Sequence, residues 1–137
     1  MGIIYDEKGR VFKLDTLHTS YMMGIADEEG FLGHIYYGKR ISACDVSYLL
    51  RIQEPPFVPS KNNGDRISFL DAFPVEYPTH GIGDFREAAL RIRTQGGHKA
   101  CALTYASHRI YEGKKKLPGL PASFAGEGEC ETLEIVC

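Results

Sequence analysis

The sequence predicts an all-β domain, an antiparallel β-sandwich, and three observations support that fold class. Several short segments alternate apolar and polar residues, as half-buried strands do. The chain contains 15 Gly and 7 Pro but no Trp, which indicates many turns and few long helices. Its 137 residues are enough for one domain but too few for a closed (β/α)8 barrel, which takes about 250 residues. Short strands separated by Gly and Pro turns are typical of a sandwich.

The first third of the chain predicts three strands. Residues 10–15 alternate so that Phe12 and Leu14 share one face, and residues 20–25 and 31–37 follow as the second and third strands. The acidic segment 27–30 between the last two ends in Gly30, which tolerates a positive φ. We therefore expect the second and third strands to form a hairpin.

The middle of the chain changes character twice. Residues 39–54 are the longest stretch without Gly or Pro, and the i, i+3, i+4 spacing of Val46, Leu49 and Leu50 predicts one or two helical turns. Five of the seven prolines then fall between Pro55 and Pro78. We expect a long loop there, and loops of more than about 12 residues are often functional in compact domains.

The last third predicts further strands. The apolar residues of segment 84–93 fit one face of a helix as well as one face of a strand, so their spacing alone does not distinguish the two. Strand patterns follow at 100–105, 108–111 and 131–136. Because the sequence ends at Cys137, one residue after this last strand pattern, we expect the domain to be truncated.

Charge and composition exclude several classes of function. The net charge of −2 provides no basic surplus for neutralising phosphates, so we expect no nucleic acid partner. No apolar run approaches the roughly 20 residues that cross a bilayer, so no membrane association is expected. The N-terminus becomes charged at Asp6, without the apolar core of a secretory signal. We expect a soluble, cytoplasmic protein.

Metal and cofactor signatures are weak. Cys44, Cys101, Cys130 and Cys137 include no C-x-x-C pair, and the five histidines lack metal-ligand spacing. We expect no metal site, and thiols rather than disulfides. Gly81-x-Gly83 could open a dinucleotide-binding loop, but Arg86 occupies the third glycine position, which favours a plain turn. No set of residues suggests a nucleophile, a base and an oxyanion hole together.

Several motifs carry a resemblance to a known family. Phe69-Leu70-Asp71, Glu76-Tyr77-Pro78 and Gly81-x-Gly83-Asp84-Phe85-Arg86 resemble the SLD, EYP and G-x-GDFR motifs of bacterial α-galactosidases of glycoside hydrolase family 36. Segments that look like further landmarks of that family occur in the same order along nearly the whole chain, at 19–21, 30–39, 107–114, 117–122 and 131–135.

The resemblance implies that residues 1–137 are the N-terminal β-sandwich (super-sandwich) domain of a much longer enzyme. In the family, a following (β/α)8 barrel carries an aspartate nucleophile and an aspartate acid/base. Together they hydrolyse terminal α-galactosides such as melibiose and raffinose with retention of configuration. No metal or organic cofactor is implied. Neither catalytic aspartate has a counterpart in these residues, so we expect the chain alone to be inactive.

Site residues follow only from the resemblance. Members of the family are homotetramers in which a long loop of this domain borders the active-site pocket of a neighbouring subunit. The matching positions here are Glu54 and Arg66, a carboxylate and a guanidinium that could bind sugar hydroxyls. The family's acid is usually Asp, so Glu54 reaches one methylene further. The alternative for Arg66 is an ion pair with Asp65 or Asp71 within the loop.

The G-x-GDFR motif is interpreted as structural. Asp84 is expected to accept backbone N–H groups at the turn, and Arg86 to tie neighbouring strands. The family also favours a strand over residues 89–93.

Two other functions stay open. The first is a free-standing carbohydrate-binding β-sandwich module, although such modules usually offer a row of exposed aromatics and the chain has no Trp. The second is a relative that transfers galactose or prefers N-acetylgalactosamine, a choice that residues outside this chain would decide.

Overall fold

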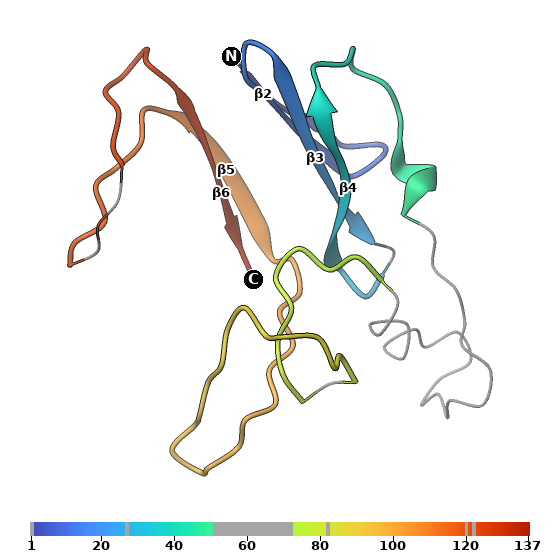
Figure 1. Ribbon diagram of the computed structural model, residues 1–137, viewed down its shortest axis with the longest axis vertical. Helices are drawn as coiled ribbons and strands as arrows, with labels where there is room; N and C mark the ends of the chain where they lie inside the picture. The colour runs from blue at the N-terminus through green and yellow to red at the C-terminus, as the bar shows by residue number, and fades with distance from the viewer. Residues whose placement is uncertain (1, 27, 51–72, 82, 120, 122) are drawn as a thin grey trace.

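The computed structural model describes residues 2–26, 28–50, 73–81, 83–119, 121 and 123–137. Within these ranges the fold is all-β and antiparallel, as predicted (Figure 1). A four-stranded sheet follows chain order, and a separate hairpin pairs the last two strands. The strands are β1 (Gly2–Asp6), β2 (Val11–Asp15), β3 (Thr19–Ala26), β4 (Phe31–Lys39), β5 (Ser107–Glu112) and β6 (Glu131–Val136).

Five of these strands match predicted segments, and β1 was not predicted. β1 contributes only Ile3, Ile4 and Tyr5 before charged residues begin, which is too short for a clear alternation. Its pairing with β2, from Gly2 opposite Asp15 to Asp6 opposite Val11, makes it a strand. Pairing to a neighbour, rather than its own pattern, therefore defines β1.

The expected hairpin between β3 and β4 is confirmed. Gly30 adopts φ +74°, and its N–H donates to the carbonyl of Ala26 at 2.9 Å. A positive φ at this corner is a conformation that a side chain would strain. The register of the pair shifts between Met22 and Met23, which inserts an extra residue into β4 opposite that step.

Two predicted strands are wrong. Residues 100–105 have a strand-like sequence but form no strand, and residues 89–93 contain only an isolated bridge between Leu90 and Thr79. An alternating pattern indicates an extended segment with two unlike faces, but only a ladder of bonds to a neighbour makes it a strand. The predicted helical turns near Val46 shorten to a 3-10 helix, η1 (Ser47–Leu49).

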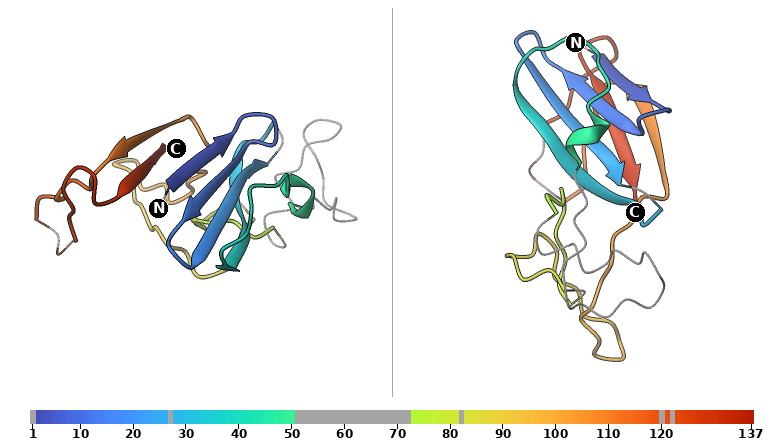
Figure 2. Two further views of the ribbon diagram at one scale, coloured as in Figure 1. Left: turned by 90° about the horizontal axis from the view of Figure 1, so that it is seen from above. Right: turned by 90° about the vertical axis from the view of Figure 1, so that its right-hand side faces the viewer.

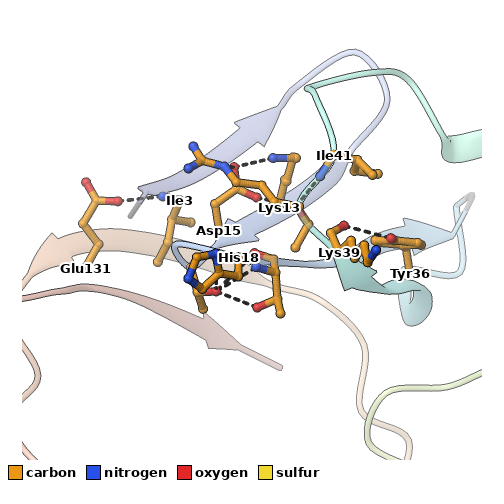
Figure 3. A network of polar contacts seen from close by, with 12 residues as sticks. Ile3, Lys13, Asp15, His18, Tyr36, Lys39, Ile41 and Glu131 are labelled. Carbon is orange, nitrogen blue, oxygen red and sulfur yellow. Dashed lines mark hydrogen bonds and ion pairs between the residues drawn. The ribbon is translucent and has the colours of Figure 1, made fainter.

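The hairpin of β5 and β6 covers one face of the four-stranded sheet at its β1–β2 end (Figure 2). Phe12 on β2 is 0% exposed. Its ring lies 4.5 Å from that of Tyr5 and 4.8 Å from that of His108 on β5. Glu131 on β6 accepts a hydrogen bond from the edge N–H of Ile3 at 2.6 Å (Figure 3). The hairpin therefore contacts the sheet through an aromatic cluster and through the hydrogen bond of Glu131 to the edge of β1.

The segment after β4 covers the opposite face of the sheet. Val46 packs in one buried cluster with Val11 of β2 and Met22 of β3. Both faces of the sheet are thus covered, although the alternation in the sequence predicts only one apolar face.

Burial of that second face requires a polar network around Asp15 (Figure 3). Lys13, only 5% exposed, forms an ion pair with Asp15. The buried Ser20 hydroxyl donates to Asp15 Oδ1 at 2.6 Å and accepts from the N–H of Ile41 at 3.1 Å. The hydrogen bond from Lys13, followed by that from Ser20, lowers the pKa of Asp15. The network satisfies the buried charges and fastens the start of the covering segment.

We expect Phe12→Ala to lower the free energy of unfolding by about 3–5 kcal/mol, since it empties a fully buried aromatic site. Phe124→Ala is the matched control, because Phe124 is 69% exposed, and its effect should stay within about 0.5 kcal/mol. Equilibrium urea unfolding of the two variants measures both. Equal, small losses would contradict the central packing role of Phe12.

Candidate functional site at the ends of residues 51–72

The two residues predicted to contact substrate, Glu54 and Arg66, lie outside the residues that the structure describes. The described residues on either side, Leu50 and Phe73, converge on Gly33 of β4. A Cβ at Gly33 would lie 2.5 Å from Phe73 Cζ and 2.7 Å from Leu50 Cδ2. Only glycine permits this approach of two side chains to the sheet. The two ends of the segment 51–72 therefore meet above one backbone position.

Residues 73–76 run along the sheet at β4. The N–H of His34 donates to the carbonyl of Pro74 at 2.7 Å, and the N–H of Glu76 donates to that of Leu32 at 2.9 Å. An isolated antiparallel bridge pairs Gly33 with Val75. Backbone pairing therefore fixes the chain directly after the predicted loop, in the register that seats Phe73, which is 2% exposed.

Glu76 adds a second anchor, made by its side chain. The Tyr21 hydroxyl donates to the Glu76 carboxylate, and His34 Nδ1 lies 3.1 Å from Glu76 Oε1. Desolvation, and then the hydrogen bond to Glu76, raises the pKa of Tyr21, so this phenol stays protonated as a donor. Glu76 belongs to the EYP motif, which by itself indicated no role for this carboxylate. Its partners on β3 and β4 are distant in sequence, and only the fold brings them together.

Arg86 completes the anchor through three separate donors. Nε and Nη2 donate to the two carboxylate oxygens of Asp84 at 2.9 and 2.8 Å. Nη1 donates to the carbonyl of Phe73 at 2.6 Å. The expectation that Arg86 ties neighbouring strands stays a prediction, because the bond to Phe73 joins Arg86 to a residue outside the strands. Arg86 thereby binds the residue that directly follows the segment 51–72.

Asp84 has the predicted structural role. It is 4% exposed and accepts the backbone N–H of Arg86 at 3.0 Å. Its hydrogen bond to the Arg86 side chain is the main cause that lowers its pKa. Gly83 before it has φ +93°, and Gly81 has φ +92°, as a turn at Gly81-x-Gly83 requires. We call Gly33, Leu50, Phe73, Asp84 and Arg86 the clasp.

The clasp and Glu76 position the backbone. The carboxylates of Glu76 and Asp84 are both already held by fixed donors. Among the described residues, no three His, Cys, Asp or Glu side chains are grouped so that they could hold a metal ion. The cysteines, Cys44, Cys101, Cys130 and Cys137, are free thiols. No helix in the described ranges is long and apolar enough to cross a membrane.

The described residues thus form an antiparallel β-domain in which the clasp holds Leu50 and Phe73 against β4. Residues 30–137 match the model of the glycosyl hydrolase family 36 N-terminal domain. The chain belongs to glycoside hydrolase family 36, whose N-terminal domain it contains. The resemblance given by the EYP and GDFR motifs is thereby confirmed.

Relatives align over almost the whole chain. The bifunctional alpha-galactosidase/sucrose kinase AgaSK of Mediterraneibacter gnavus is 41% identical over 99% of this chain, which is 14% of that protein. Alpha-galactosidase AgaA of Geobacillus stearothermophilus is 36% identical over 99% of this chain, which is 19% of that protein. The chain therefore spans less than a fifth of the length of these relatives.

Solved structures show the same fold. The galactosidase domain of AgaSK superposes with a TM-score of 0.83 at 40% identity, covering 98% of this chain and 19% of that one. The GH36 alpha-galactosidase AgaB from Geobacillus stearothermophilus gives 0.81 at 39% identity, covering 98% and 18% respectively.

Replacement of Arg86 by Lys should destabilise the protein by about 2 kcal/mol, because one ammonium cannot bond both Asp84 oxygens and the Phe73 carbonyl. Arg91→Lys is the matched control, since Arg91 forms an exposed i,i+4 ion pair with Glu87, and its change should be at most about 0.5 kcal/mol. Urea unfolding compares the two. Equal effects would mean that the clasp contributes little.

The substitution Asp84→Asn should make the stability of the protein less sensitive to acid. A carboxylate whose pKa is lowered by folding stabilises the native state above its unfolded pKa, and that contribution is lost as pH falls through the folded pKa. The variant should be less stable than the wild type at pH 7. Its melting temperature should also change less between about pH 5 and pH 2. Thermal unfolding over this range is the measurement, and parallel curves would contradict the expectation.

Proposed function

We propose that this chain is the N-terminal accessory and oligomerisation domain of a retaining α-galactosidase that hydrolyses terminal α-galactosides such as melibiose and raffinose. The observation that carries the proposal is the alignment of nearly the whole chain with the first-named relatives, both α-galactosidases, while it spans at most 19% of their length. The catalytic carboxylates then belong to a barrel beyond these residues, and the chain by itself is inactive. Retention requires two carboxyl groups about 5–5.5 Å apart in that barrel.

The domain's contribution to the substrate pocket is the segment 51–72. Glu54 would accept, and Arg66 donate, hydrogen bonds to sugar hydroxyls in the pocket of a neighbouring subunit. The clasp supports this role, since it fixes both ends of the segment against β4. A loop whose ends are fixed loses less conformational entropy when it meets a ligand.

Assembly as a homotetramer in the cytoplasm is part of the same proposal. Phe85, in the GDFR motif, is 92% exposed, and Tyr77 of the EYP motif is 51% exposed. Large apolar side chains at such positions are typical of surfaces that become covered on association. Their position next to the clasp would place a subunit contact beside the segment that borders the neighbouring pocket.

In the full-length enzyme, Arg66→Ala should raise KM for raffinose about tenfold or more with little change in kcat, since a charge-assisted hydrogen bond to a bound sugar is worth about 1.5–3 kcal/mol. Arg109→Ala is the control, because Arg109 pairs with Glu134 on the exposed face of β5 and β6. Steady-state kinetics together with sedimentation of both variants give the result. Unchanged kinetics with intact oligomers would reject the pocket role.

A titration of the isolated chain with galactose and raffinose separates the proposal from a free-standing carbohydrate-binding module. The accessory domain alone holds only part of a pocket and should show no saturable binding. Saturable binding at millimolar or lower concentration would favour the module instead.

A further inference from the structure

Residues 79–81 and 83–104, which include Asp84 and Arg86 of the clasp, form an arm that extends away from both sheets (Figure 2). Two lengths of backbone run along the arm and meet at a turn in which the N–H of Thr94 donates to the carbonyl of His98 at 3.0 Å. Near its base, the N–H of Cys101 donates to the carbonyl of His80 at 3.0 Å. The arm is therefore held by specific bonds, although its described residues contain no strand.

A cavity of about 500 Å³ lies along this arm, and its lining is strongly basic. Arg86, Arg91, Arg93 and Lys99 all line it, together with His80. The other described residues of the lining, Ala88 and Ile92, are apolar, so no carboxylate is among the described residues that line the cavity. Four cations thus gather at one site in a chain whose net charge is −2.

Only two of the four cations are matched by a carboxylate. Arg86 pairs with Asp84, and Arg91 pairs with Glu87 through side chains that are 71% and 83% exposed. In the part of the chain that the structure describes, Arg93 and Lys99 have no carboxylate within ion-pair distance. Like charges around one cavity repel each other, and an anion bound between them would remove that cost.

The geometry of the lining points to a phosphate-type ligand. Guanidinium groups present planar forks that match the oxygens of a phosphate, and Lys supplies a further point charge. The fork of Arg86 is already bound to Asp84 and its Nη1 to the Phe73 carbonyl, so Arg86 contributes a fixed positive charge to the lining rather than a free fork. A volume of 500 Å³ lies within the roughly 300–1,000 Å³ of small-molecule sites.

We propose that this cavity binds a small anion carrying a phosphate group. The site goes beyond the proposed function, because α-galactosides are neutral and Arg93 and Lys99 are not among the residues assigned to the sugar. Two sources share the required chemistry, a free inorganic phosphate or pyrophosphate and the phosphate ester of a sugar.

The test is calorimetric titration of the full-length protein with inorganic pyrophosphate and, in separate arms, with inorganic phosphate, glucose 6-phosphate and glucose. The wild type should bind pyrophosphate, and the affinity should fall as salt is added. The double variant Arg93→Gln/Lys99→Gln should raise Kd at least about tenfold, because it removes two charge-assisted contacts. Stronger binding of glucose 6-phosphate than of phosphate would identify a sugar phosphate as the source, and equal or weaker binding a free phosphate.

The matched control is Lys8→Gln/Lys116→Gln, which removes the same charge from exposed positions outside the cavity. It should leave Kd within about twofold. Absence of pyrophosphate binding by the wild type up to about 10 mM would overturn the proposal, as would equal losses in the two double variants. Arg66→Ala should leave anion binding intact while altering galactoside kinetics, so the two proposals can fail independently.

Discussion

The structure depends on the close approach of Leu50 and Phe73 to β4 at Gly33. Any side chain at Gly33 would occupy the space that both fill, and without them one face of the sheet would lose part of its cover. The same contact brings together the two ends of residues 51–72. A packing constraint in the core and the closure of a predicted substrate-contact loop are therefore one interaction.

Cover on both faces explains why the four-stranded sheet contains charged groups in its interior. Phe12 packs under the hairpin of β5 and β6 on one face, while Lys13 points to the other and pairs with Asp15. A buried ammonium or carboxylate is costly unless paired and hydrogen-bonded. The polar residues of the alternating pattern in β2 are therefore satisfied by this paired network and not by solvent.

The candidate site could be anticipated only in part. The GDFR motif stands out in the sequence, and the acceptor role of Asp84 follows from the turn before it. The bond of Arg86 to the Phe73 carbonyl could not be predicted, because it joins residues whose proximity depends on how residues 73–76 run along β4. Glu76 shows the same limit, since Tyr21 and His34 reach it across two strands.

The sequence by itself determined the antiparallel all-β class, the β3–β4 hairpin with its glycine corner, and membership of the family, since period, turn chemistry and motif order are local properties. Tertiary structure alone decided that Gly2–Asp6 is a strand while residues 100–105 are not, although the second segment has the better pattern. It also decided which cations share a cavity on the arm. The physical reason is that a strand, a clasp and a charged cavity each need a partner distant in the chain, and period and composition do not encode where that partner lies.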